Sequence, residues 1–117
     1  ILTIKSLAGP GIDFETISRK PATAAPFEGA AVDAIRRAVD AEDPGAVVLP
    51  YLNSAGTDAK GFAVLPDGRR INYYGCTPLR LPADFDFINL FHGVDERVPV
   101  GSLVFGAKVV DHILQEA

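Results

Sequence analysis

The side chains best suited to chemistry in this sequence are His92 and, four residues later, Glu96. A histidine after an apolar run and before a glycine can be a metal ligand, a general base or a packed loop residue. The spacing His-x-x-x-Glu forms half of a ligand pair, but it lacks the second histidine of the helical zinc motif. Glu96 could instead orient His92 as a supporting residue. On spacing alone, packing within a loop is the commoner role for such a histidine.

A second candidate is the polar loop that holds Gly56, Thr57 and Asp58, shortly after the apolar run at residues 46–49. In α/β sheets, ligands collect beyond the carboxyl ends of the strands. Backbone N–H groups at the start of a following helix suit a carboxylate or a phosphate. The same residues also have a structural interpretation, in which Asp58 caps a short helix and Gly56 permits a tight turn. Spacing does not decide between the two.

The remaining reactive side chains indicate no site. Cys76 has no flanking basic cluster or partner histidine, which is typical of a small apolar loop residue. His112 falls on the polar face of the last predicted helix and is expected at the surface. Ser54 lacks the Gly-x-Ser-x-Gly frame of a hydrolase nucleophile. The sequence contains no phosphate-binding or dinucleotide-binding glycine pattern.

The composition restricts the class of protein. The chain has 117 residues, of which 48% are hydrophobic and 22% are charged, with a net charge of -4. These values fit one ordinary domain or part of a larger one, and they argue against disorder. We expect no nucleic-acid partner, because no basic stripe could neutralise phosphates. We expect no membrane span or signal peptide. A single cysteine excludes an internal disulfide and favours a reducing compartment, the cytoplasm.

The elements that must position the candidates alternate between strands and helices. Strands are predicted at residues 1–7, 12–18, 46–49 and 71–74. Helices are predicted at residues 27–39, 58–65 and 102–117, and a long loop is predicted at residues 75–91. This order predicts an α/β fold in which strands pack against helices. The two prolines in residues 19–26 indicate a connector between domains.

Two helices have a clear apolar stripe. In the first, the apolar residues follow an unbroken three-four repeat, Pro26 lies near the first turn, and Glu28 favours the positive helix start. In the last, Ser102 is the expected N-cap. Its predicted core stripe consists of Leu103, Ala107, Val110 and Leu114.

Three separated blocks match one known family. They are residues 48–60 (VLPYLNSAGTDAK), 74–78 (YGCTP) and 91–100 (FHGVDERVPV). In this order they resemble the C-terminal part of the di-zinc exopeptidases related to carboxypeptidase S, aminoacylase, acetylornithine deacetylase and succinyl-diaminopimelate desuccinylase. The resemblance implies that residues 1–24 end a lid or dimerisation domain and that residues 25–117 belong to the catalytic domain. Because the chain opens at Ile1 in strand-like sequence and has no Met, we expect it to be a piece of a longer protein.

The resemblance also implies roles for individual residues. His92 matches a histidine that binds one of two zinc ions, and Gly56 and Thr57 match the loop that approaches the substrate carboxylate. Asp58 matches a residue that holds this loop, and Glu96 matches a support for the histidine turn. The family's His-x-Asp pair, its paired glutamates and its bridging aspartate are missing from this sequence. The chain therefore carries no catalytic residue of its own.

A catalytic zinc ion needs three protein ligands and an open position, and this chain supplies one imidazole. We therefore expect part of a zinc-dependent enzyme that hydrolyses a peptide or N-acyl amino acid beside a free carboxylate, inactive alone and without retained zinc. Its expected partners are that substrate, the missing part of the catalytic domain and further copies of itself, since exposed apolar surface drives association. The alternative is a freestanding, non-catalytic α/β module that binds a small carboxylate or a partner protein. A third interpretation is an enzyme assembled from two chains.

Overall fold

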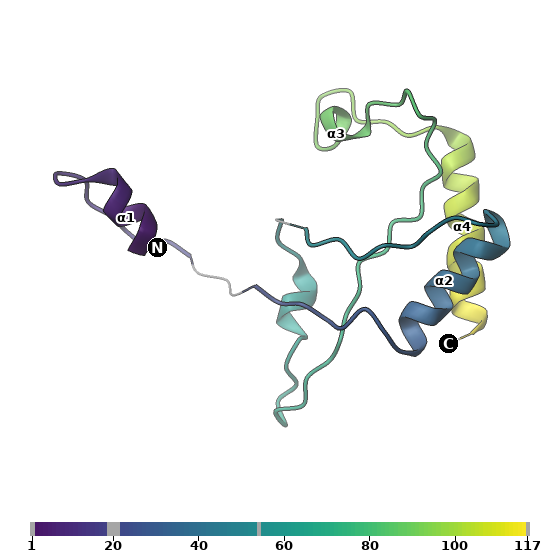
Figure 1. The fold of residues 1–117 in the computed structure, drawn as a ribbon, viewed down its shortest axis with the longest axis horizontal. Helices are drawn as coiled ribbons and strands as arrows, with labels where there is room; N and C mark the ends of the chain where they lie inside the picture. The colour runs from purple at the N-terminus through teal and green to yellow at the C-terminus, as the bar shows by residue number, and fades with distance from the viewer. Residues whose placement is uncertain (1, 19–21, 54, 117) are drawn as a thin grey trace.

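The computed structural model describes residues 2–18, 22–53 and 55–116, and its regular structure is helical (Figure 1). The helices are α1 (Leu2–Ala8), α2 (Ala30–Glu42), α3 (Phe87–Leu90), α4 (Val100–Gln115) and a single 3-10 turn, η1 (Asp58–Gly61). Ile1, residues 19–21 of the predicted connector, Ser54 and Ala117 lie outside the described residues. In Figure 1, α2 and α4 lie side by side, and α1 stands apart from them.

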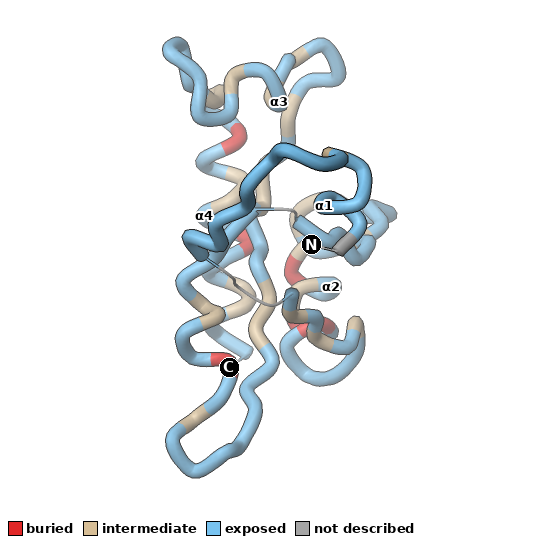
Figure 2. The backbone as a smooth tube through the Cα atoms, turned by 90° about the vertical axis from the view of Figure 1, so that its left-hand side faces the viewer, coloured by how far each residue is buried: buried red, intermediate tan, exposed pale blue. Residues whose placement is uncertain are grey.

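The core is the contact between α2 and α4, the one pair of helices that pack together in the described part of the chain. Val32 and Ala38 of α2 and Val109 of α4 are almost completely buried, and Figure 2 marks such positions on both helices. Ser102 is buried as well, and its hydroxyl donates to the carbonyl of Arg80 at 2.6 Å. This bond ties the segment before α3 to the start of α4.

Charged side chains in the C-terminal halves of α2 and α4 form ion pairs between the two helices. Lys108 and His112 of α4 both reach Glu42 at the end of α2, at 3.1 and 3.2 Å. The hydrogen bond from Lys108, helped by the one from His112, lowers the pKa of the Glu42 carboxyl. Arg37 pairs with Glu116 just beyond α4, and this hydrogen bond lowers the pKa of Glu116. His112 is therefore not a plain surface residue but one of the groups that join the two helices.

The predicted α/β fold is wrong, because the described residues form no sheet. Their one β contact is an isolated antiparallel bridge between Val64 and Arg70. Residues 12–18, 46–49 and 71–74 follow an irregular path, and residues 2–7 of the first predicted strand lie within α1. Short apolar or alternating runs suit a helix as well as a strand. A strand is stable only where a neighbouring strand satisfies its backbone groups.

The first long helix is confirmed, but it begins later than predicted. Its N-cap is Gly29, with a φ of 97°, so Pro26 and Glu28 lie before the helix. Asp33 is the acidic residue of the first turn. The hydroxyl of Tyr74 donates to the carbonyl of Pro26 at 2.8 Å. The entry to α2 is thus held by a hydrogen bond from a distant part of the chain rather than by a local cap.

The last helix is also confirmed, but its predicted core stripe is wrong. Leu103, Val110 and Leu114 are 54%, 42% and 69% exposed, whereas Val109 is fully buried. The side that faces the core is that of Ser102 and Val109. Because α4 is apolar on two sides, its periodicity could not indicate which side would be covered.

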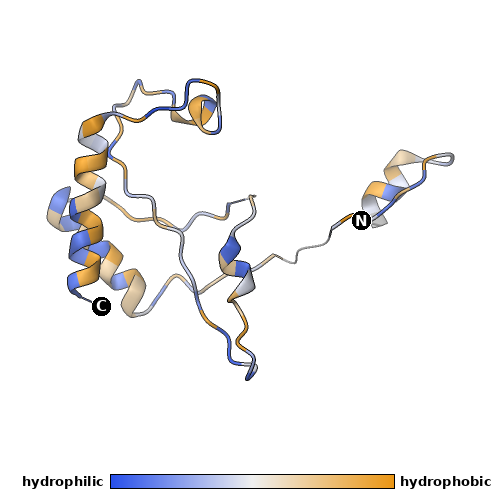
Figure 3. Ribbon diagram, turned by 180° about the vertical axis from the view of Figure 1, so that it is seen from behind, coloured by the Kyte–Doolittle hydropathy of each residue, from blue (hydrophilic) through white to orange (hydrophobic). Residues whose placement is uncertain are grey.

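The molecule is open rather than compact. Its radius of gyration is 18.9 Å, whereas a compact domain of this length has a radius of about 13 Å. Figure 3 shows hydrophobic residues in the irregular segments of the described chain as well as in its helices. No helix in the described ranges is both long and apolar enough to cross a lipid bilayer.

Candidate functional site

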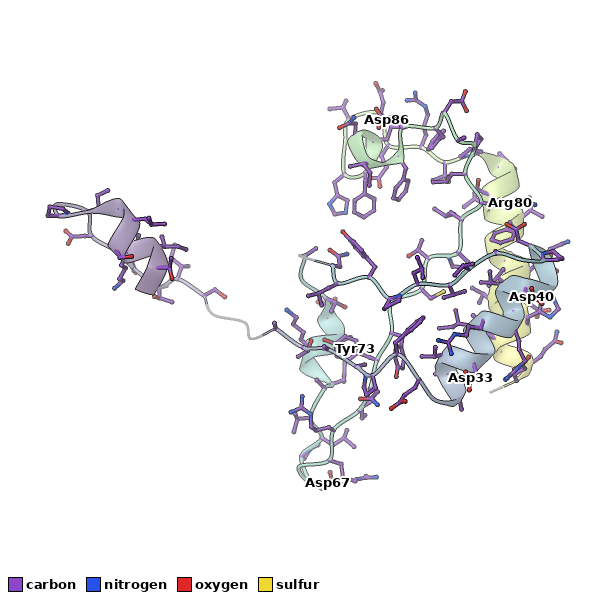
Figure 4. All side chains as sticks on the ribbon, in the orientation of Figure 1. Asp33, Asp40, Asp67, Tyr73, Arg80 and Asp86 are labelled. Carbon is purple, nitrogen blue, oxygen red and sulfur yellow. The ribbon has the colours of Figure 1, made fainter. Side chains whose placement is uncertain are left out.

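His92 lies in the turn that follows α3. Asp86, labelled in Figure 4, begins this helix, and its carboxylate accepts hydrogen bonds from the backbone N–H and the side-chain amide of Asn89 at 3.4 and 2.8 Å. After the helix, the N–H of Gly93 donates to the carbonyl of Leu90 at 2.8 Å. Local hydrogen bonds therefore hold both ends of α3 and fix the backbone around His92.

The backbone of His92 is strained. With a φ of 59°, it is the one non-glycine residue with positive φ in the described part of the chain. Phe91, before it, has a φ of -63° and a ψ of 120°. These angles are those of a type II turn, in which the second central position usually holds glycine. The turn thus places a histidine at a position where an L side chain is unfavourable, and puts Gly93 one residue later.

An aromatic stack supports the imidazole. The ring of His92 lies on that of Phe91, with centroids 4.3 Å apart and planes 16° apart. The ring of Phe87 lies tilted beside that of Phe91, with centroids 5.4 Å apart and planes 38° apart. His92 is exposed, and no hydrogen bond or ion pair between described residues uses its nitrogens. The ring is therefore held on one face while its nitrogens face no protein partner. The i, i+4 spacing of Phe87 and Phe91 could have indicated their contact, but it carries no signal for the stack of Phe91 on His92.

Glu96 is not brought to the imidazole as predicted. It is exposed, and no hydrogen bond links it to His92 within residues 55–116. Beside it, Arg97 donates to the carbonyl of Asp95 at 3.1 Å. The run of three charges at residues 95–97 is therefore exposed to solvent, and a supporting role for Glu96 stays a prediction.

The loop with Gly56 and Thr57 is built differently from its predicted form. Thr57, not Asp58, caps η1: its hydroxyl oxygen accepts from the N–H of Ala59 at 3.3 Å. The carbonyl of Thr57 accepts from the N–H of Lys60 at 3.2 Å. Gly56, Thr57 and Asp58 are all exposed. The hydroxyl of Thr57 still has its hydrogen available, so it can donate to a carboxylate.

The two candidate regions remain separate. No hydrogen bond or ion pair links residues 56–58 with the turn at residues 91–93, both of which are described. In Figure 1, α3 and the teal turn of η1 lie in different parts of the molecule. The structure therefore does not assemble one pocket from both.

The residues present do not fit a complete zinc site. Among the described residues, no group of three or more histidine, cysteine or carboxylate side chains is placed to hold a metal ion. A catalytic zinc ion needs three protein ligands, and here only the imidazole of His92 is available near the predicted site. No reaction step can be assigned to a metal bound by this chain alone.

An open cavity of about 430 Å³ lies elsewhere, between α4 and the segment before α3. Its charged lining residues are Glu42, Arg80, which Figure 4 labels, and Lys108. Arg80 pairs with Asp43 at 3.2 Å, and Lys108 pairs with Glu42. Because each cation already has a carboxylate, the cavity offers no unbalanced charge to a ligand. These long-range pairs had no local signal in the sequence.

The thiol of Cys76 shows no sign of activation. Its surface reaches solvent, yet the protein atoms packed around it disfavour the thiolate and raise the pKa of the thiol.

Comparison with known proteins adds no candidate: no family model, curated protein or solved structure matches the chain.

Proposed function

We propose that this chain contributes His92, as one metal-binding imidazole, to a zinc-dependent exopeptidase or amidohydrolase whose other metal ligands lie outside it. The substrate class is a peptide or N-acyl amino acid cleaved beside a free carboxylate. The Gly56–Thr57 loop is proposed to contact that carboxylate. The proposed compartment is the cytoplasm, where the exposed Cys76 would stay reduced.

The observation that carries this proposal is the left-handed backbone of His92. A non-glycine residue in this conformation costs of the order of 1 kcal/mol, and such strain is concentrated at functional sites. A glycine at position 92 would relieve it. The imidazole is exposed and its ring is held against Phe91, an arrangement that suits a metal ligand. The three sequence blocks that resemble di-zinc exopeptidases supply the chemical class.

The chain by itself is proposed to be inactive. A single imidazole does not bind zinc tightly, and the family's general-base glutamate has no counterpart in the sequence. Calorimetric titration of the chain with zinc chloride is expected to show only weak binding, with a dissociation constant above about 10 µM. Stoichiometric binding below about 1 µM would reveal a complete site and would overturn the proposal.

The ligand role is tested in the polypeptide expressed from the complete reading frame. His92→Ala is expected to lower the zinc content by up to one ion per chain and the rate of N-acyl amino acid hydrolysis by about a hundredfold. His112→Ala is the matched control, because His112 of α4 pairs with Glu42 of α2 and has no proposed metal role. Normal zinc content and turnover in His92→Ala would refute the assignment.

The substrate role of Thr57 has a narrower test in the same polypeptide. Thr57→Val keeps the shape but removes the hydroxyl, both as a donor to the substrate and as the cap of η1, so KM is expected to rise several-fold with little change in kcat. Thr57→Ser keeps the donor and should behave like the parent enzyme. An unchanged KM in Thr57→Val would leave the loop with a purely structural role.

The open shape of the molecule favours one alternative, a non-catalytic module that binds a partner protein or a small carboxylate. Leu49 and Tyr51 are 73% and 86% exposed on the segment after α2, and such surface suits a protein partner. This alternative predicts that the product of the complete reading frame binds no zinc and hydrolyses no N-acyl amino acid. An enzyme assembled from two chains predicts activity only after a second polypeptide is added.

A further inference from the structure

Residues 46–53, between α2 and η1, form an open stretch whose backbone has no partner in the described part of the chain. The stretch contains no helix, turn or bend, and in Figure 1 it runs from the end of α2 without folding back. No backbone hydrogen bond between described residues uses the N–H or C=O groups of residues 47–52. A β-strand is completed by a neighbour that satisfies these groups. The stretch therefore has the form of a strand without its neighbour.

Both ends of the stretch are fixed by local hydrogen bonds. At its start, the N–H of Ala46 donates to the carbonyl of Asp43 at 3.0 Å. At its end, the side chain of Asn53 accepts from the N–H of Ala55 at 2.8 Å. A segment held between two turns loses less conformational freedom when a partner binds it.

Pro50 decides which edge of this strand can be paired. In a β-strand, residues two apart direct their N–H and C=O groups toward the same edge. One edge carries three intact donors, those of Val47, Leu49 and Tyr51. The opposite edge is interrupted at Pro50, which has no N–H. Because proline is confined to edge strands, the stretch can take one neighbouring strand, on the edge of Leu49.

The side chains of the stretch suit a sheet without charges. Val47, Leu49 and Tyr51 share one face of an extended strand, and all three are exposed. β-Branched and aromatic side chains are favoured in strands. No charged residue occurs between Asp43 and Asp58, although charges are the common protection of a free sheet edge. The stretch is thus unprotected against pairing, as a strand with a regular partner would be.

We propose that this stretch binds the exposed edge of a β-sheet in a partner protein, through the backbone of Val47, Leu49 and Tyr51. Strand addition of this kind takes its affinity from main-chain hydrogen bonds and its specificity from alternate side chains. The edge strand of the partner carries apolar side chains on the face shared with Leu49 and no charge opposite it.

The same features argue against other occupants. The described residues contain no strand that could serve, because their one β contact is the isolated bridge between Val64 and Arg70. A helix could cover the apolar face but would leave the backbone groups unpaired. A second copy would add one strand only, because Pro50 closes the other edge in both copies. Such a two-stranded ribbon is marginal in water, whereas an existing sheet offers several strands at once.

Binding of a synthetic β-hairpin tests the proposal. The probe is a fluorescein-labelled hairpin with an Asn-Gly turn and alternating valine and threonine, so that the stretch becomes its third strand. Fluorescence anisotropy is expected to give a dissociation constant of about 100 µM or lower. A control hairpin with N-methyl groups on its outer amides keeps the side chains but cannot pair, so it should not bind. Absence of binding of the first probe at about 1 mM, or equal binding of both probes, overturns the proposal.

Two proline variants identify the edge. Leu49 and Leu52 are both 73% exposed, but they direct their N–H groups to opposite edges of the stretch. Leu49→Pro removes a donor from the paired edge and is expected to weaken hairpin binding at least about tenfold. Leu52→Pro removes a donor from the edge that Pro50 already interrupts, and its effect should stay below about threefold. Both variants are expected to keep the helicity of the parent at 222 nm. Equal weakening by the two substitutions overturns the proposed edge.

Sedimentation without the probe distinguishes the partner from a second copy. The parent chain and Leu49→Pro are expected to sediment alike at about 100 µM. Self-association that Leu49→Pro abolishes and Leu52→Pro does not would place a second copy on this edge and overturn the proposal. The inference is independent of the proposed function, because these measurements need neither zinc nor His92.

Discussion

The α2–α4 pair and the segment at residues 46–74 contain similar apolar side chains, but among its described residues the segment buries only the small side chain of Ala63. Val32 and Val109 are 1% and 0% exposed, whereas Val47 and Leu49 are 78% and 73% exposed. A helix satisfies most of its backbone hydrogen bonds internally, so one partner is enough to bury an apolar side. An irregular or extended segment must first find partners for its backbone. The difference shows that apolar content alone does not create a core.

The largest expected effect is the loss of the helix pair in Val109→Asp. An unpaired carboxylate at this fully buried position should destabilise the chain by about 3 kcal/mol or more. Helicity at 222 nm and urea unfolding would measure the loss. Val47→Asp is the matched control, because Val47 is exposed, and it should change stability by less than about 0.5 kcal/mol. Equal effects of the two substitutions would mean that burial does not distinguish the two regions.

A smaller effect is expected where the irregular chain touches α4. A Cβ at Gly106 would lie 2.5 Å from the carbonyl oxygen of Pro78, so Gly106→Ala must displace that segment and should cost about 1–3 kcal/mol. Gly101→Ala, on the same helix, meets nothing within 4 Å. That control should stabilise the chain by up to about 1 kcal/mol through helix propensity. Thermal unfolding of both variants measures the contrast, and a tolerated Gly106→Ala would show that the contact is loose.

Acid should weaken the helix pair before it affects the rest of the chain. The pKa of Glu42 is lowered in the folded chain, mainly by the hydrogen bond from Lys108. Its contribution to stability is therefore present above the unfolded pKa, near 4.3, and is lost as the pH falls through the folded pKa. Helicity at 222 nm is expected to fall in this pH range. Glu42→Gln should make the helicity less dependent on pH and should lower the free energy of unfolding at neutral pH.

Asp67 is the matched control for this pH effect. Hydrogen bonds from the backbone and then the side chain of Arg69 lower its pKa too. These bonds lie within one turn of the irregular segment, so Asp67→Asn should leave the acid response of the helices unchanged. A common response of Glu42→Gln and Asp67→Asn would indicate general charge effects rather than the contact at Glu42.

The smallest expected effect concerns Cys76, on the segment that leads from residue 74 to α4. Burial raises the pKa of its thiol, and only the thiolate reacts quickly with alkylating reagents. Alkylation by iodoacetamide at neutral pH is therefore expected to be a few-fold slower in the folded chain than in urea. Equal rates would show that the residues around Cys76 do not shield it.

The sequence predicted the two long helices but not the way they pack. The three-four repeat predicted over residues 27–39 is only partly buried: Ala34 and Ala38 are covered, whereas Val32, outside the repeat, is buried as well. In α4, Leu103 and Val109 lie on two apolar sides, and only the position of α2 decides which side becomes core. A repeat within one helix carries no information about a partner helix that begins 58 residues later, which is the separation of Glu42 and Val100.

The predicted strands failed for a related reason. The run at residues 46–49 has strand-like composition, but a strand requires another strand beside it.

In the candidate site, too, the sequence indicates the chemistry of single residues but not the local backbone around them. His92 was identified by its side-chain chemistry, whereas its left-handed backbone follows from the turn around it. Thr57 rather than Asp58 became the cap of η1, since both residue types suit that role and local geometry selects one.

The order of the two helices along the chain has a consequence for biosynthesis. α2 leaves the ribosome before residues 43–99 and long before α4. During that interval the apolar side of α2, with Val32 and Ala38, has no helix to cover it. Nascent chains with such uncovered surface are the clients of chaperones. Stalled synthesis anywhere before Val100 would therefore release a polypeptide that cannot complete its core.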